Sequence, residues 1–276
     1  MKIRNYANLV CAVLFMTVFA LTSAFAAGGA EQSGAAAYTI EVGGSTSVTP
    51  LMELFAAEYA KVKPNIKVNI NGTGSGDGIT NAGATYQIGM SSRELTPAEQ
   101  GRGLRAEVVA IDGIAVIANR NNAVANLTVE QIRGIYTGTI TNWNQVGGRN
   151  AAIAVVSREE GSGTRGAFEE LVGFQGRLLA NANQLTSTGA ILANIAQNPD
   201  AIGYISLGSV NDTIKAISVA GTAATPENVK AGRYQIARPF IVLTGNNVHA
   251  ESKAFVEWML SSAGQTIVSR SWITVR

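Results

Sequence analysis

Three times along this chain, a short β-type run ends in a turn rich in glycine, serine and threonine and then passes into a helical pattern. The turns are Gly44–Ser47, Gly72–Gly76 and Gly161–Thr164. Strands that alternate with helices in this way predict an α/β fold with mostly parallel sheets flanked by helices. In such sheets ligands bind beyond the carboxyl ends of the strands, where the helices begin. We therefore expect the three turns to converge and to present hydroxyl and backbone N–H groups to one small ligand.

The third turn carries the strongest chemical signal. It belongs to Ser157–Arg165 (SREEGSGTR), which follows the apolar run Ala151–Val156 and precedes the helical pattern Ala167–Leu171. A glycine-rich turn that opens a helix directs N–H groups toward an anion, and Arg158 adds a fixed positive charge with a fork of donors. An ordinary capping turn is the alternative for any one turn. Three turns of the same chemistry, one beside an arginine, favour an anion site.

The rest of the chain supplies the other elements of an α/β fold. A long apolar run, Glu107–Ala118, is broken by Asp112 and Gly113, so it can pass from one domain into another with the glycine at the bend. The other expected strands are Tyr38–Val42, Ile66–Ile70, Gln87–Met90, Ala201–Leu207, Ile214–Val219 and Ala237–Leu243. Expected helices are Val48–Lys63, Ile79–Ala84, a short one capped by Thr96, Leu127–Ile135, Ala190–Gln197, Ser252–Leu260 and Gly264–Ser269.

The beginning of the chain reads as an export signal. Residues 1–26 contain Lys2 and Arg4, an apolar run, and the ending Ala24-Phe25-Ala26, which together predict a cleaved signal peptide. Residues 27–37 then read as a flexible lead-in. Lipid attachment at Cys11 is the disfavoured alternative, because this cysteine starts the apolar run rather than ending it. We expect an exported, periplasmic or extracytoplasmic protein.

Composition excludes several classes of function. Removing Lys2 and Arg4 lowers the number of basic residues from 21 to 19, which equals the number of acidic residues, so a nucleic-acid partner is not expected. The only cysteine, Cys11, lies in the predicted signal peptide, and the only histidine, His249, is expected to be a surface residue at a helix start. No metal site and no cofactor are therefore expected. The turn Gly72–Gly76 also lacks the lysine of a nucleotide-binding loop.

The chain resembles the periplasmic phosphate-binding proteins that serve ABC transporters. The resemblance is carried by GGSTSVTP, GTGSGDGI, IYTGTITNWNQVGG, VVSREEGSGTR and AIGYISL, at Gly43–Pro50, Gly72–Ile79, Ile135–Gly148, Val155–Arg165 and Ala201–Leu207. It implies the two-lobe periplasmic-binding-protein fold of type II, with Glu107–Ala118 and Ala237–Leu243 as two crossover strands. Lobe I would comprise residues 38–112 plus 240–276, and lobe II residues 113–239.

The same resemblance implies a set of phosphate-binding residues, with Glu160 orienting the arginine. By position in this chain they are Thr46, Ser47, Ser75, Ser92, Arg158, Ser162, Gly163 and Thr164. Ser92 stands where well-known members carry an aspartate that accepts a proton from phosphate and so excludes sulfate. Two hypotheses address this departure: Arg93 adds a positive charge, or Asp77 supplies the missing acceptor.

The function implied is capture of inorganic phosphate by hinge closure and delivery to an ABC permease in the membrane, by a monomer that is not an enzyme. A binding protein for another oxyanion, such as sulfate or molybdate, and a phosphate sensor are the alternatives. A secreted phosphatase or hydrolase is a weaker one, because Ser162 as a nucleophile would depend on His249 as its base.

Overall fold

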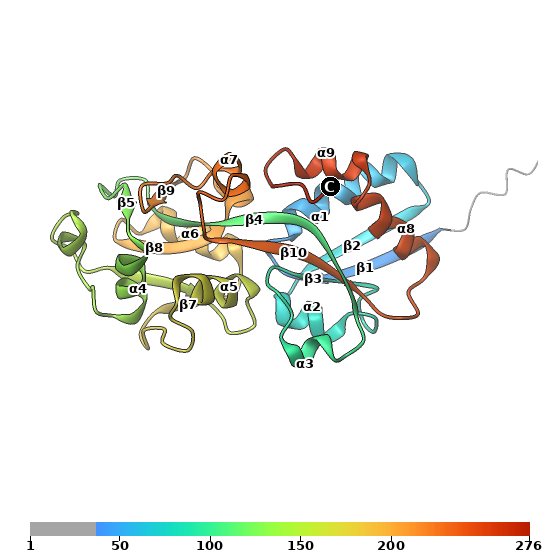
Figure 1. The fold of residues 1–276 in the computed structure, drawn as a ribbon, viewed down its shortest axis with the longest axis horizontal. Coiled ribbons are helices and arrows are strands. Elements are labelled where there is room, and N and C mark those ends of the chain that lie inside the picture. Colours follow the sequence, from blue (N-terminus) through green and yellow to red (C-terminus); the bar gives the residue numbers. More distant parts are fainter. Residues whose placement is uncertain (1–36) are drawn as a thin grey trace, which may run out of the picture. The chain divides into compact units, whose positions relative to one another are not determined.

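A mixed β-sheet organises the structure, which is a computed structural model that describes residues 37–276 (Figure 1). The predicted signal peptide and residues 27–36 of the lead-in lie outside the described residues. The strand order is β2-β1-β3-β10-β4-β8-β6-β7, with β9 pairing with both β4 and β5. The strands are β1 (Tyr38–Gly44), β2 (Ile66–Gly72), β3 (Ile88–Ser91), β4 (Arg105–Asn119), β5 (Asn126–Leu127), β6 (Ala154–Arg158), β7 (Asn183–Leu185), β8 (Ala201–Ser206), β9 (Ile214–Val219) and β10 (Ala237–Thr244).

Two groups of parallel strands are joined by two long antiparallel ones. Strand β1 is parallel to β2 and β3, and β6 is parallel to β7 and β8. Strands β4 and β10 are antiparallel to each other, β10 is antiparallel to β3, and β4 is antiparallel to β8. The α/β class is confirmed, and the antiparallel pairing is concentrated on the two strands that connect the groups (Figure 1).

Helices cover the sheet, and most begin within two residues of the predicted start. Thr96 and Thr128 each form a capping box, in which the side chain and the residue three positions on satisfy free backbone N–H groups. Within residues 37–276 the α-helices are α1 (Thr49–Val62), α2 (Ser75–Asn81), α3 (Pro97–Gln100), α4 (Val129–Thr137), α5 (Gly163–Val172), α6 (Thr188–Gln197), α7 (Pro226–Lys230), α8 (Ala250–Met259) and α9 (Ser262–Val268). Two 3-10 helices, η1 (Trp143–Val146) and η2 (Leu207–Ser209), complete this set.

Two large apolar clusters fill the interior, and we name them the first and the second core. The first core includes Phe55, Phe240 and Phe255 and lies between the β1–β3 group and helices α1, α8 and α9. The second core includes Tyr136 and Phe168, whose rings meet at 5.1 Å. All the described residues nevertheless fall in one compact unit.

Strands β4 and β10 each pass from one core to the other. Along β4, Ala110 belongs to the first core and Ile114 to the second. Along β10, Ala237 packs against the second core and Phe240 belongs to the first. The two strands pass from one core to the other side by side, because Ala237 pairs with Gly113 and Phe240 with Ala110 in the antiparallel ladder.

Within residues 37–276, no helix combines the length and the apolar character needed to cross a membrane.

Candidate functional site

The three predicted turns meet in one group of side chains, which we call the hydroxyl cluster: Ser45, Thr46, Ser47, Ser75, Ser92, Thr164 and Thr188. Ser47 and Thr164 share a hydrogen bond of 2.8 Å between their hydroxyl oxygens. Ser45 Oγ donates to Ser92 Oγ at 2.8 Å, and Ser75 Oγ lies 3.3 Å from Ser92 Oγ. Apart from Thr46, which is half-buried, these side chains are buried. The predicted convergence is therefore present in the structure.

The first turn connects β1 to α1, and its glycine is required by a close approach of two backbones. Gly44 has φ +134°, and a Cβ there would lie 2.3 Å from the carbonyl oxygen of Met90. Ser45 donates its backbone N–H to that same oxygen. This contact directs the following residues, Thr46 and Ser47, toward the hydroxyl cluster at the start of α1.

The second turn connects β2 to α2, and its helix begins earlier than predicted. The sequence indicates a helix from Ile79, whereas α2 starts at Ser75 inside the glycine run. Gly74, with φ +100°, makes the turn before it. The Gly76 N–H donates to the carbonyl oxygen of Gly161 at 3.0 Å, so the second turn is joined to the third through the backbone.

The third turn connects β6 to α5, and it also carries a helix start that the sequence analysis placed four residues later. Helix α5 begins at Gly163, because Ser162 acts as its N-cap and accepts the Arg165 N–H at 3.3 Å. Ser162 is buried, and its hydroxyl oxygen is the acceptor of this capping hydrogen bond. A Cβ on Gly163 would lie 2.3 Å from Ser75 Oγ and 3.0 Å from Ser92 Oγ. Gly163 is thus packed directly against the hydroxyl cluster.

Arg158 is the buried cation of the third turn, with a side chain only 3% exposed. Glu159 accepts from its Nε at 2.9 Å and from its Nη2 at 2.8 Å, and the carbonyl oxygens of Leu185 and Thr186 accept from the same two nitrogens. The expectation for Glu160 is wrong: that residue is exposed, and Glu159 orients the arginine. Among residues 37–276, no partner accepts a hydrogen bond from Arg158 Nη1, which leaves this nitrogen able to donate to a ligand.

The backbone of Arg158 is held by a buried tyrosine. Its N–H donates to the Tyr204 hydroxyl oxygen at 3.2 Å, and that hydroxyl shares a 2.8 Å hydrogen bond with Ser157 Oγ. Burial raises the pKa of Tyr204 to about 12, so the phenol stays neutral in the physiological range. Arg158 is therefore held in place by hydrogen bonds of both its backbone and its side chain.

Ser92 lies within the hydroxyl cluster, whereas the two residues suggested to compensate for it have other partners. Its N–H donates to Ser75 Oγ at 3.1 Å. Asp77 accepts from Asn81 Nδ2 at 2.7 Å and from the Tyr86 hydroxyl at 2.9 Å. Arg93 pairs with both oxygens of Glu99, at 2.7 and 2.8 Å. Neither Asp77 nor Arg93 makes a hydrogen bond to the hydroxyl cluster in the part of the chain that the structure describes.

The sequence analysis missed Ser45 and Thr188 as members of the cluster. Thr188 Oγ1 lies 3.3 Å from the hydroxyl oxygens of both Thr46 and Ser47, and its N–H donates to Thr46 Oγ1. Thr188 is the first residue of α6, which Ser187 caps. The predicted capped helix at this place was a usable signal, because Thr186–Gly189 has the same composition as the other turns.

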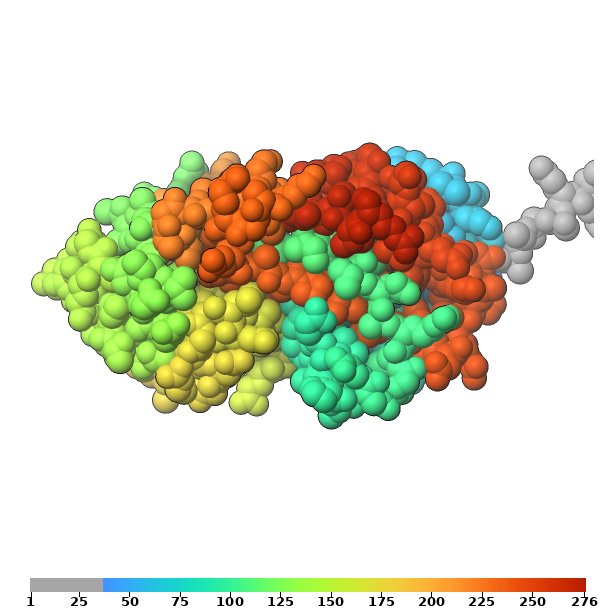
Figure 2. Space-filling model, viewed as in Figure 1, coloured from blue at the N-terminus to red at the C-terminus, as the bar shows by residue number. Residues whose placement is uncertain are grey.

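The start of α6 also completes the electrostatics of the cluster. Helices α1, α2, α5 and α6 each begin at a residue of the cluster or within two residues of one, so four helix N-termini direct partial positive charge toward it. The hydroxyl groups of the cluster lie in segments that follow strands of both parallel groups. Figure 2 shows the outside of this junction, where the yellow α5 segment abuts the teal segment that follows β3. A Cβ on Gly166 of α5 would lie 3.3 Å from Arg93 Cδ in that segment.

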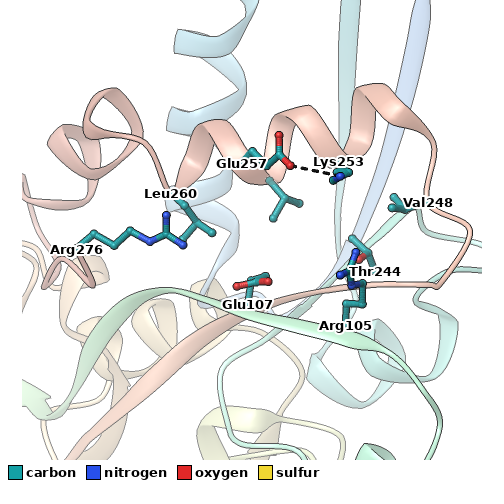
Figure 3. Close-up of a pocket in the computed structure, with 9 residues that line it drawn as sticks. Arg105, Glu107, Thr244, Val248, Lys253, Glu257, Leu260 and Arg276 are labelled. Carbon is teal, nitrogen blue, oxygen red and sulfur yellow. Dashed lines mark ion pairs between the residues drawn. The ribbon is translucent and has the colours of Figure 1, made fainter.

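An open pocket of about 370 Å³ lies elsewhere and includes none of the hydroxyl-cluster residues. It is bounded by the start of β4, the end of β10 and α8 (Figure 3). Its charged lining consists of Arg105, Glu107, Lys253, Glu257 and Arg276, with Lys253 3.7 Å from Glu257. Opposite charges side by side do not select an anion, so the convergence of donors, rather than pocket size, identifies the candidate site.

The single histidine of the chain has a structural role. His249 is exposed and acts as the N-cap of α8, with Nδ1 accepting the Glu251 N–H, and its ring stacks on Tyr38 at 4.0 Å. The expectation of a surface histidine at a helix start is confirmed. Within the described part of the chain, no hydrogen bond joins His249 to Ser162, whose hydroxyl accepts from Arg165 N–H instead. Residues 37–276 contain no group of three or more histidine, cysteine, aspartate or glutamate side chains that could hold a metal ion.

Comparison with known proteins places this geometry in a family. The model of the PBP superfamily domain matches residues 29–263. The phosphate-binding protein PstS of Borreliella burgdorferi is 33% identical over 242 residues, which cover 83% of this chain and 87% of that protein. A protein of Clostridium perfringens, described as a substrate-binding protein of phosphate ABC transport and solved with bound phosphate, is 44% identical with a TM-score of 0.84. The match covers 86% of this chain and 100% of that one.

A second solved structure agrees with the first. The ABC-type phosphate transport receptor of Vibrio cholerae is 36% identical with a TM-score of 0.71, and the match covers 86% of this chain and 99% of the receptor. The similarity thus extends over nearly the whole length of each of these relatives, and the family-model match, residues 29–263, includes all three turns of the hydroxyl cluster. This chain belongs to the PBP superfamily and, within it, to the family of the PstS phosphate-binding proteins.

Proposed function

We propose that this protein captures inorganic phosphate at the hydroxyl cluster and Arg158, and delivers it to an ABC permease. The observation that carries the proposal is the convergence of hydroxyl groups from both groups of strands beside a buried guanidinium, whose Nη1 has no hydrogen-bond partner within residues 37–276. The proposed ligands are Thr46, Ser47, Ser75, Ser92, Arg158, Ser162, Gly163 and Thr164, to which Thr188 is added. Ser162 and Gly163 are proposed to contribute through the backbone at the start of α5.

The chemistry of the cluster suits a small, dehydrated oxyanion. Neutral hydroxyl donors, backbone N–H groups and helix N-termini can surround such an ion without a large excess of charge. Arg158 is already balanced by Glu159, so the ion is held mainly by hydrogen bonds and only partly by net charge. A micromolar or tighter dissociation constant, about 8 kcal/mol or more, is within reach of so many donors.

We further propose that the protein has two lobes, with residues 38–112 plus 240–276 in lobe I and residues 113–239 in lobe II. The two cores support this division, because β4 and β10 pass between them beside Gly113 and Pro239. Only these two strands would connect the proposed lobes. Bending of a few residues in each strand would therefore change the angle between the lobes.

Burial of the cluster supports a hinge mechanism. Ser47 of lobe I and Thr164 of lobe II are 1% and 2% exposed and are in direct hydrogen-bond contact. An ion therefore reaches them only when the lobes separate. The ion then replaces the hydroxyl–hydroxyl contacts with its own oxygens, and the closed form is what the permease would recognise.

The signal-peptide prediction adds that the protein is exported and acts outside the cytoplasm, and we propose that it does so as a monomer without enzymatic activity.

Isothermal titration calorimetry tests this proposal, with phosphate as ligand and sulfate and molybdate as competitors. The expected result is one phosphate per chain, with an affinity that Arg158→Ala lowers about a hundredfold or more, because hydrogen bonds to a charged group contribute up to about 3 kcal/mol. Glu159 is 27% exposed, so its carboxylate can hydrate when the arginine is removed, and the fold should persist. The matched control is Arg149→Ala, which removes an exposed arginine that pairs with Asp200 and should not change the affinity.

Two results would contradict the proposal. The first is tighter binding of sulfate or molybdate than of phosphate, which would reassign the ligand. The second is undiminished phosphate binding by Arg158→Ala, which would place the site elsewhere. Incubation of the same preparation with a chromogenic phosphate ester addresses the phosphatase alternative, for which the expected result is no turnover.

A further inference from the structure

A buried ion pair joins the two strands that cross between the cores. Asp112 of β4 and Arg238 of β10 are direct partners in the antiparallel ladder, and their side chains are 0% and 2% exposed. Arg238 Nη2 lies 3.1 Å from Asp112 Oδ2, and Arg238 Nε lies 3.3 Å from the same oxygen. The pair sits at the proposed hinge.

Each member of the pair has a second partner, on opposite sides. Asp112 Oδ1 accepts from Ser206 Oγ, at the end of β8, at 2.8 Å. Arg238 Nη1 donates to the carbonyl oxygen of Ser92 at 3.1 Å. A continuous chain of hydrogen bonds therefore runs from the end of β8, through both crossing strands, to the peptide of Ser92 in the hydroxyl cluster.

The guanidinium of Arg238 is the member of the pair that faces the candidate site. Burial lowers its pKa most, Asp112 raises it, and the positive charge of Arg158 lowers it again, which means that the two buried arginines interact. The charged groups around Arg238 are Asp112 and Arg158, with Glu159 paired to Arg158. Phe240 of β10 lies beneath the guanidinium at 5.4 Å from its ring centroid.

Stability alone does not explain a pair of this kind. Removing two charges from water costs as much as their attraction returns, and well-packed apolar residues often stabilise a core equally well. The pair is oriented, however, with its positive end toward the hydroxyl cluster and its negative end away from it. An anion in the cluster would be attracted by Arg238 more than it is repelled by Asp112.

We propose that Arg238 is a positioning residue for the anion site, holding the Ser92 peptide in place and adding its charge behind it, and that Asp112 limits how strongly this charge acts. The inference rests on the proposed function, since it concerns the same bound ion. It predicts that changes at the two ends of the pair move phosphate affinity in opposite directions. A pair that only supports the fold would lower affinity whichever member is changed.

The test is calorimetric phosphate titration of Asp112→Asn and Arg238→Gln at pH 8. We expect Asp112→Asn to bind phosphate several-fold more tightly, because the negative charge behind Arg238 is gone. We expect Arg238→Gln to bind at least tenfold more weakly, and Arg238→Lys to recover most of this loss because it restores the charge. The matched control is the exposed pair Arg149 and Asp200, changed to Gln and Asn, where no shift is expected.

A pH series separates the charge of Asp112 from its packing. Burial raises the pKa of Asp112 to about 6, so the wild-type carboxyl becomes neutral as the pH falls through this value. Wild type should then approach Asp112→Asn in affinity between pH 8 and pH 5. Phosphate's own titration cancels, because both proteins are measured with the same ion at each pH.

Losses of affinity in both Asp112→Asn and Arg238→Gln, or a ratio between wild type and Asp112→Asn that is constant with pH, would overturn the inference. If Asp112→Asn does not fold, the comparison of Arg238→Lys with Arg238→Gln still tests the inference. Equal phosphate affinities for these two variants would also overturn the inference. Absence of phosphate binding in the wild type is a different outcome, because it refutes the proposed function itself.

Discussion

Replacing Gly163 with alanine adds one methyl group at the contact between the proposed lobes. The new Cβ would lie 2.3 Å from Ser75 Oγ and 2.8 Å from Ser75 Cβ. Both distances are shorter than any real Cβ contact, so either Ser75 or the whole of α5 must move. Because Ser75 is 1% exposed and belongs to the other of the two proposed lobes, the movement would amount to incomplete closure.

The size of the effect follows from the cost of overpacking. One extra carbon in a tightly packed contact costs about 1–3 kcal/mol, which corresponds to a roughly 5- to 150-fold weaker affinity for phosphate. The cost falls on the closed form only. Gly163 does not have a positive φ, and it is the first residue of α5, where alanine is well tolerated. The thermal stability of the phosphate-free protein should therefore change little, provided that its lobes are open.

The assay is phosphate titration calorimetry, paired with small-angle X-ray scattering to measure the compaction that phosphate causes. Gly161→Ala is the matched control, since Gly161 lies in the same turn, has no positive φ, and has nothing within 4 Å of its Cβ position. We expect Gly163→Ala to lose both affinity and compaction, and Gly161→Ala to retain both. Equal affinities for the two variants would refute the idea that closure brings Gly163 against Ser75.

Two further perturbations test other parts of the structure. Thr188→Val keeps the shape of the side chain but removes a hydroxyl that contacts Thr46 and Ser47, so phosphate affinity should fall by about 0.5–1.5 kcal/mol, roughly two- to tenfold; an unchanged titration curve would exclude Thr188 from the site. The Arg93 hydrogen bonds lower the pKa of Glu99 from 4.5 to about 2, so this glutamate stabilises the fold above pH 4.5 and loses its contribution as the pH falls toward 2. Urea unfolding at pH 6 and pH 3 should show a loss in the wild type of about 2 kcal/mol that Glu99→Gln lacks, and parallel losses would count against the pair.

The sequence predicted the strands better than the helix starts at the functional turns. The alternating apolar pattern of a strand such as Tyr38–Val42 reports burial directly, and β1 begins at the predicted residue. Helices α2 and α5 instead begin within glycine and serine, which are poor helix formers, so local propensity places their starts too late. At α5 the Ser162 cap and the packing of Gly163 against Ser75 outweigh that propensity.

The candidate site shows the same division between local and long-range information. Sequence composition identified three turns, but it contained no means of ranking Glu159 over Glu160, because the path of the chain after β6 decides which carboxylate turns back onto Arg158. Thr188 meets Thr46 only through tertiary structure, 142 residues away along the chain.

Asp112 and Arg238 are 126 residues apart along the chain, and their pairing depends on the register between β4 and β10. Neither residue lies in a motif, so only the antiparallel ladder reveals that they face each other.

A crystal structure of the phosphate complex would show directly where the ion binds. We expect one phosphate ion between the two proposed lobes, hydrogen-bonded to Ser47 and Ser75 on one side and to Arg158 and Thr164 on the other. The ion would separate the hydroxyl oxygens of Ser47 and Thr164, which are 2.8 Å apart in the present structure. A phosphate bound elsewhere, such as in the pocket beside α8, or held by residues of one lobe alone, would contradict it.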